Sequence, residues 1–200
     1  MGDRWTEDYG FGDADRRLMS FLASKLSPAR VRHSLGTWDA ARRLVQRYQV
    51  SVDPNSLAQA ALLHDCAREL PEEQLKSFGV GSSWSVGLVH GSAGAEMVRR
   101  ELGVVDESVL EAIEYHTTGR PGGGALLSLV LAADYLDEGR RTAPSSKDWT
   151  ERSRCQEEAV SLEDLCRRII GQKLSWCLRR GLWVAPIAVA AYNWYLEGSP

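Results

Sequence analysis

Residues 60–69 read Ala60-Ala61-Leu62-Leu63-His64-Asp65-Cys66-Ala67-Arg68-Glu69, so two apolar turns lead directly into an adjacent histidine and aspartate. His64 belongs to a set of positions that recur at helical spacing and define one inward, apolar face, namely Leu57, Ala60, Ala61, His64 and Arg68. An imidazole and a carboxylate carried into a core are costly to bury without partners. A metal ion would satisfy both groups. The stretch therefore predicts a helical core organised around a metal site.

Composition is that of a single globular domain. The chain has 200 residues, 44% hydrophobic and 26% charged, and its 24 basic and 27 acidic side chains give a net charge of −3. This balance argues against a nucleic-acid or anionic-membrane binder. The polar N-terminus does not resemble a signal peptide, and the apolar stretch 182–196 is short for a membrane span. We expect a cytoplasmic protein with a small-molecule partner and four reduced cysteines; a homodimer is left open.

The pattern of breakers and caps predicts an all-α fold, because we find no alternating strands or hairpin turns. Ser27-Pro28 and Asp53-Pro54 each resemble a cap followed by a proline in the first helical turn. Residues 1–12 are expected to form a loose lead-in, residues 13–142 the core of the domain, and residues 143–200 C-terminal helices packed on it. The expected helices are 13–26, 28–48, 54–70, 86–102, 106–117, 124–138, 156–180 and 185–196.

All four histidines fall on expected helices, on or beside faces that should point inward. They are His33, His64, His90 and His116, and Asp134 extends the apolar stripe Leu127, Val130 and Leu131 in the same way. A single histidine on an apolar face is more often a satisfied core residue than a ligand. Together with Asp65, however, the joint pattern favours a metal site. Its nitrogen and oxygen ligands, with no thiolate, point to iron, manganese or another borderline-to-hard metal.

These residues and their neighbours carry a family resemblance. The matching segments are Arg30-x-x-His33, Leu62-Leu63-His64-Asp65-x-Ala67-Arg68-Glu69, His90-Gly91, Ala112-Ile113-x-x-His116-Thr117-x-Gly119 and Ala133-Asp134-Tyr135-Leu136-x-x-x-Arg140. The chain resembles the HD-domain metallophosphohydrolase superfamily, and within it the YqeK family of symmetrical diadenosine-tetraphosphate hydrolases. The similarity covers roughly residues 16–142. The family usually has lysine where this chain has Arg68, which keeps the charge but changes the geometry.

The resemblance implies a helical HD fold and two metal ions, expected to be iron, with manganese or another divalent metal as alternatives. His33, His64, Asp65 and Asp134 would be the core ligands, with His90 and His116 beside the second ion or the substrate phosphates. The implied reaction is hydrolysis of diadenosine tetraphosphate to two ADP by a metal-activated water. The implied catalytic residues are Asp65, Arg68 and His90, and the implied substrate contacts are Arg30, His90, His116, Thr117 and Arg140.

The arginines have a plainer interpretation as solvated surface charges, and Thr117-Thr118-Gly119 as an ordinary helix end. Two other functions also stay open. One keeps the site but changes the substrate, as in a nucleotide phosphatase or a guanosine polyphosphate hydrolase. The other is a non-catalytic HD module that binds a nucleotide or a partner protein. Such a module would be expected to have lost ligands, whereas all six are present in this chain.

Overall fold

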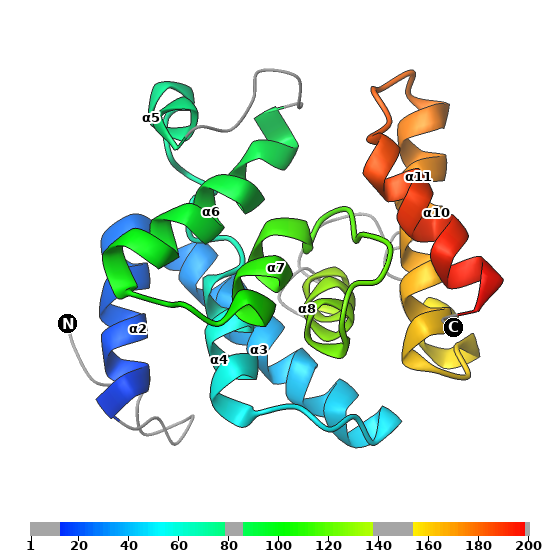
Figure 1. Ribbon diagram of the computed structural model, residues 1–200, viewed down its shortest axis with the longest axis horizontal. Helices are drawn as coiled ribbons and strands as arrows, with labels where there is room; N and C mark the ends of the chain where they lie inside the picture. The colour runs from blue at the N-terminus through cyan, green and yellow to red at the C-terminus, as the bar shows by residue number, and fades with distance from the viewer. Residues whose placement is uncertain (1–12, 79–85, 138–153, 199–200) are drawn as a thin grey trace.

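Helices account for all the regular secondary structure that the computed structural model describes, which covers residues 13–78, 86–137 and 154–198 (Figure 1). The all-α prediction is confirmed. None of the described helices is both long enough and apolar enough to cross a membrane. The principal helices are α2 (Asp13–Lys25), α3 (Pro28–Tyr48), α4 (Pro54–Leu63), α5 (Glu72–Ser77), α6 (Val86–Leu102), α7 (Glu107–Tyr115), α8 (Ala125–Leu136), α10 (Leu162–Arg179) and α11 (Pro186–Glu197).

Helix α8 is the centre of the molecule. Ten of its twelve residues are buried, and it packs against α3, α4, α7 and α10. A helix that is apolar on all sides is stable only when neighbours surround it. Asp134 therefore enters the interior with the helix that carries it, and its carboxylate requires partners there.

Local capping explains several boundaries that the sequence indicated. Asp53 accepts a hydrogen bond from the backbone N–H of Ser56 at 2.8 Å, and Pro54 follows in the first turn of α4. Asp106 caps α7 in the same way through the N–H of Ser108 at 2.9 Å. These caps set where α4 and α7 begin, and the two helices in turn carry His64 and His116 at their C-terminal ends.

Two predicted helix boundaries were wrong. The helix that begins at Pro54 ends at Leu63 instead of Leu70, and residues 64–69 form consecutive turns, followed by the unexpected short helix α5. The helix expected over 156–180 begins at Leu162, because the side chain of Ser161 accepts a hydrogen bond from the N–H of Asp164 at 3.1 Å. A separate helical segment over 154–158 precedes it.

The C-terminal helices α10 and α11 pack on each other, and α10 packs on α8. The Ser128 hydroxyl on α8 lies 2.8 Å from the Tyr195 hydroxyl on α11, which joins this pair to the central helix. In Figure 1 the pair stands on one side of α7, with α5 and α6 on the other side. The expected lead-in at residues 1–12 and the whole stretch 139–153 lie outside the described residues.

Candidate metal centre

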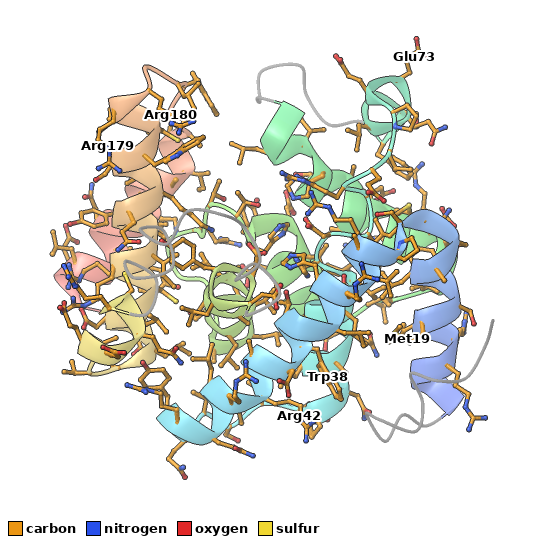
Figure 2. The ribbon with its side chains drawn as sticks, turned by 180° about the vertical axis from the view of Figure 1, so that it is seen from behind. Met19, Trp38, Arg42, Glu73, Arg179 and Arg180 are labelled. Carbon is orange, nitrogen blue, oxygen red and sulfur yellow. The ribbon has the colours of Figure 1, made fainter. Side chains whose placement is uncertain are left out.

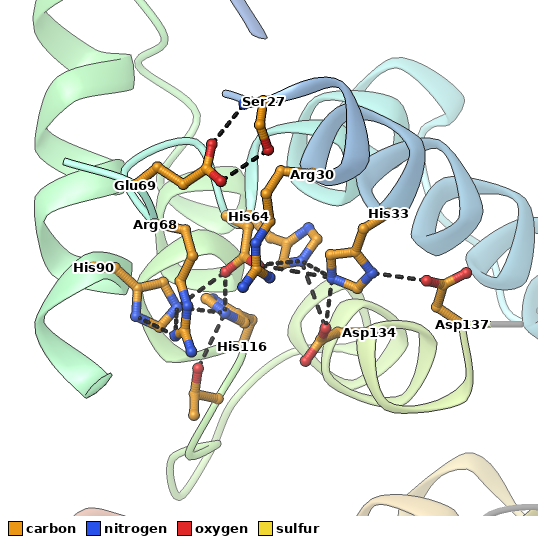
Figure 3. A network of polar contacts seen from close by, with 12 residues as sticks. Ser27, Arg30, His33, His64, Arg68, Glu69, His90, His116, Asp134 and Asp137 are labelled. Carbon is orange, nitrogen blue, oxygen red and sulfur yellow. Dashed lines mark hydrogen bonds and ion pairs between the residues drawn. The ribbon is translucent and has the colours of Figure 1, made fainter. Parts of the chain in front are cut away.

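Six predicted ligands meet in the interior, where they arrive from five helices (Figure 3). Each is at most 9% exposed, and His64 is fully buried. The contributing positions are His33 on α3, His64 and Asp65 just after α4, His90 on α6, His116 just after α7, and Asp134 on α8. Residues separated by a hundred positions in the sequence thus form one polar cluster inside an apolar core.

One half of the cluster consists of His33, His64 and Asp134. The Nε2 atom of His33 lies 3.1 Å from Asp134 Oδ1 and 3.3 Å from His64 Nε2. The distance from His64 Nε2 to Asp134 Oδ1 is 3.6 Å. These three atoms are close enough together to share one ion. Two nitrogens and one oxygen form a ligand set suited to a borderline or hard divalent metal.

The other half consists of His90 and His116, and Asp65 joins the two halves. Asp65 Oδ1 lies 3.1 Å from His90 Nε2 and 3.6 Å from His116 Nε2. Its second oxygen, Oδ2, lies 3.7 Å from His33 Nε2 and 3.8 Å from His64 Nε2. Each oxygen of one carboxylate therefore faces a different pair of imidazoles. This arrangement suits a carboxylate that bridges two ions.

Hydrogen bonds at Nδ1 orient three of the imidazoles. His64 Nδ1 lies 2.8 Å from the carbonyl oxygen of Ala61, and His116 Nδ1 lies 2.7 Å from that of Ile113. A carbonyl only accepts, so both Nδ1 atoms carry the proton and donate it. In a neutral imidazole this leaves a lone pair on Nε2, and in both residues Nε2 points into the cluster. Outer hydrogen bonds of this kind fix the tautomer of metal-binding histidines.

The third of these hydrogen bonds involves Asp137, a residue that the sequence analysis missed. Its Oδ2 accepts from His33 Nδ1 at 2.7 Å, and the carboxylate is only 1% exposed. A Cβ on Gly36 would lie 2.1 Å from Asp137 Oδ1, so the glycine is what makes room for the carboxylate. Asp137 follows Asp134 by three residues, and that helical spacing was the signal available in the sequence.

A close approach of two helices brings His90 and His116 together. A Cβ on Gly91 would lie 2.3 Å from the backbone carbonyl oxygen of Glu114, so only glycine permits α6 and α7 to approach this closely. As a result, His90 Nε2 and His116 Nε2 are 3.1 Å apart. The glycine after His90 in the sequence motif is thus a packing requirement of the centre.

Burial and neighbouring groups act in opposite directions on the pKa of Asp65 and of His116. Burial alone would raise the pKa of Asp65, but in the metal-free centre positive charge on His64 and hydrogen bonds from His116 and His90 hold it well below its usual range. Burial is the main cause that lowers the pKa of His116 to about 4. Near neutral pH the centre therefore presents an ionised carboxylate and a neutral imidazole, which are the protonation states that metal coordination requires.

The donor set itself tests whether metal ions fit. The Nε2 lone pairs of His64 and His116 and the oxygens of Asp65 and Asp134 are all acceptors, and they face one another across 3–4 Å. Acceptors in such an arrangement need protons or cations between them. The centre also has three carboxylates, including Asp137, against the two arginines that contact it. By itself it would repel a polyphosphate, whereas two divalent ions would make it strongly positive.

Two arginines lie at the edge of the centre. Arg30 Nη1 donates to Asp65 Oδ2 at 3.2 Å, and Arg68 Nη1 lies 3.0 Å from His90 Nδ1. The Arg68 side chain is exposed at this edge. Thr117 Oγ1 lies 3.0 Å from His116 Nε2, at the same edge. The remaining predicted contact, Arg140, lies outside the described residues.

The fold and this centre define a class of protein: an all-helical domain with a buried His–Asp cluster able to hold metal ions. A family model described as the HD domain matches residues 30–166, which contain every ligand of the cluster. The chain therefore belongs to the HD-domain family.

Similar proteins span nearly the whole chain. A protein of Bacillus subtilis named symmetrical bis(5'-nucleosyl)-tetraphosphatase is 28% identical over 188 residues, which cover 90% of this chain and 97% of that protein. One of the same name from Staphylococcus aureus is 33% identical over 131 residues, covering 62% of this chain and 66% of that protein. A solved structure from Clostridium acetobutylicum, described as a predicted HD superfamily hydrolase involved in NAD metabolism, aligns with a TM-score of 0.75 at 28% identity. It covers 94% of this chain and 99% of its own.

Proposed function

We propose that this protein hydrolyses diadenosine tetraphosphate symmetrically, with metal ions bound at the His–Asp cluster. The observation that carries the proposal is the placement of Asp65, whose two oxygens face different pairs of imidazoles in an HD-family chain. Relatives that align along most of its length bear the name of this activity. In the proposed reaction the oxygen of one water attacks a phosphorus atom of the central anhydride. The bond to the bridging oxygen breaks, and both products are ADP.

The six residues of the cluster would have different roles as ligands. His33, His64 and Asp134 would hold one ion, His90 and His116 the other, and Asp65 would bridge them. When bound, such ions supply Lewis-acid chemistry, which activates water and neutralises phosphoryl oxygens.

The arginines would act on the substrate. Arg68, beside His90, would bind the phosphoryl group under attack, and Arg30 would hold Asp65 in place and contact an outer phosphate. The HD core at residues 13–142 would supply these groups, and the C-terminal helices would complete one side of the site.

We further propose that the resident metal is iron, with manganese as the alternative. The support is chemical, because the cluster offers nitrogen and oxygen ligands without a thiolate. Cys66 is the cysteine nearest in sequence, and its thiol is directed to the carbonyl oxygen of Gly94. We place the enzyme in the cytoplasm, where its four free cysteines would stay reduced.

The test combines metal content with product analysis. Protein purified with and without oxygen is assayed for bound metal, and diadenosine tetraphosphate turnover is followed by chromatography. We expect about two ions per chain and ADP as the product, with activity lost in Asp65→Ala. The matched control is Asp39→Ala, which removes a partly exposed carboxylate of α3 that pairs with Arg43.

Three other outcomes are informative. ATP and AMP in equal amounts would mean asymmetric cleavage and would contradict the proposal. Metal binding without turnover would direct attention to other nucleotides, including nucleoside phosphates and guanosine polyphosphates. A preparation that never binds metal would overturn the mechanism and favour a non-catalytic module.

A further inference from the structure

One face of α10 changes character along its length. In the first turns this face is fully apolar and packs on the core through Leu162, Leu165, Cys166, Ile169 and Ile170, all at most 3% exposed. At the same helical spacing, the face continues with Lys173, Trp176 and Arg180. The first five positions are explained by packing. The last three lie on the same side of the helix, beyond the point where the core ends.

Lys173 connects this face to the metal centre. Its Nζ donates a hydrogen bond of 3.0 Å to the carbonyl oxygen of Thr117, in the segment that follows α7. The side chain of that same threonine lies 3.0 Å from His116 Nε2. Lys173 therefore contacts the residue that directly follows His116, a proposed metal ligand.

Trp176 and Arg180 continue the face outward. Trp176 is 46% exposed, and the guanidinium carbon of Arg180 lies 4.7 Å from the centre of its ring. The helical rise places Trp176 about 4.5 Å and Arg180 about 10.5 Å beyond Lys173 along the axis. Figure 2 shows Arg180 on the side of α10 that faces α6, and Arg179 on the outer side. A large exposed aromatic ring held by a cation is a suitable surface for a stacked base.

We propose that the inner face of α10, formed by Lys173, Trp176 and Arg180, binds one nucleoside diphosphate half of the substrate. The purine base stacks on Trp176, Lys173 binds the diphosphate on the side of the metal centre, and Arg180 holds the ring in place. The occupant is assigned by two observations: the face is continuous with the metal centre through Thr117, and its charge is opposite to that of a polyphosphate. This inference rests on the proposed function, because it names the surface that holds the substrate of the same centre.

The test separates base recognition from phosphate recognition. The affinities of ADP and of inorganic pyrophosphate are measured by calorimetry for the metal-loaded wild type and for Trp176→Ala. Stacking a base on an aromatic ring predicts that ADP binds roughly 5- to 100-fold more weakly to the variant. Pyrophosphate, which has no base, should bind within twofold of wild type. Trp176→Phe should recover most of the ADP affinity, because the smaller ring still stacks.

Neighbouring residues supply the control. Arg180→Ala should weaken ADP binding, whereas Arg179→Ala, one position along on the outer side, should not. In turnover, Trp176→Ala should raise KM for diadenosine tetraphosphate more than it lowers kcat.

Several results would overturn the inference. They are unchanged ADP affinity in Trp176→Ala, an equal loss of pyrophosphate binding, or equal effects of the two arginine substitutions. A change of oligomeric state with unchanged ADP affinity would mean that a second copy of the chain occupies this face. If the wild type hydrolyses diadenosine tetraphosphate in any of these cases, only this inference fails. If it does not hydrolyse it, the proposed function fails as well.

Discussion

Replacing Gly36 with alanine tests whether Asp137 controls the metal centre through His33. The new Cβ would lie 2.1 Å from Asp137 Oδ1, whereas ordinary van der Waals contact begins near 3.4 Å. The carboxylate must therefore move by about 1.3 Å, the difference between those two distances. Asp137 Oδ2 holds a hydrogen bond of 2.7 Å to His33 Nδ1, and we expect a displacement of that size in the carboxylate to break it.

The expected effect is on metal affinity rather than on folding. Removal of a partner that orients a metal-binding histidine typically costs 10- to 100-fold in affinity, or about 1.4 to 2.8 kcal/mol. Alanine itself is favoured over glycine within a helix by about 0.5–1 kcal/mol, which partly offsets the clash in the metal-free protein. We expect Gly36→Ala to remain folded while it loses manganese affinity in a competition titration against a chelating dye.

Two further variants sharpen the test. Asp137→Ala removes the same hydrogen bond directly, so the double variant with Gly36→Ala should be no worse than either single variant. Gly171→Ala is the control for a helical glycine, because its Cβ would meet only the Tyr192 ring, at 3.1 Å. Additive losses in the double variant, or wild-type affinity in Gly36→Ala, would refute the role of Asp137.

Three other outcomes follow from the structure. Gly91→Ala should destabilise the fold by about 1–3 kcal/mol in urea unfolding and lower activity, because it forces α6 away from α7. Asp106→Ala should cost about 1 kcal/mol through the lost cap of α7. The pKa of Asp106 is lowered, chiefly by the Ser108 hydrogen bond. The stability that the ionised Asp106 adds to the fold is therefore present above about pH 4 and is lost as the pH falls through the folded-state pKa. Asp106→Asn should keep the cap but lose this pH dependence. Burial raises the pKa of the Cys66 thiol, so mass spectrometry should find the half-buried Cys177 labelled first by a thiol reagent.

The sequence predicted best what local chemistry determines. Ser27-Pro28 and Asp53-Pro54 mark the starts of α3 and α4, because a proline in the first turn has a helical φ whatever the rest of the chain does. At α4 the Asp53 side chain adds a cap, whereas the Ser27 side chain makes no cap bond. The histidines and Asp134 could be recognised because polar groups interrupt stripes that are otherwise apolar. Periodicity alone was enough to place them on inward faces.

What the sequence did not predict depends on contacts between distant segments. Residues 64–69 contain no glycine or proline, so no strong local breaker ends α4 at Leu63. The turn is held from outside, because both carboxylate oxygens of Glu69 accept hydrogen bonds from Ser27, at 2.5 and 2.8 Å. Asp137 was missed for a similar reason. Its spacing of three residues from Asp134 was a signal, but an acidic residue after a helix usually lies in solvent, and the packing of α3 on α8 is what buries this one.

The early end of α4 also explains how one short stretch serves both halves of the centre. Beyond Leu63 the backbone hydrogen bonds run from residue i+3 to residue i, including Arg68 N–H to the Asp65 carbonyl at 2.8 Å. In such tight turns the side chains of residues i and i+3 lie in line, whereas in an α-helix they are offset. Asp65 and Arg68 consequently reach the same imidazole, at 3.1 Å from His90 Nε2 and 3.0 Å from His90 Nδ1. A cation is thereby placed beside the bridging carboxylate, where the phosphates of a substrate would arrive.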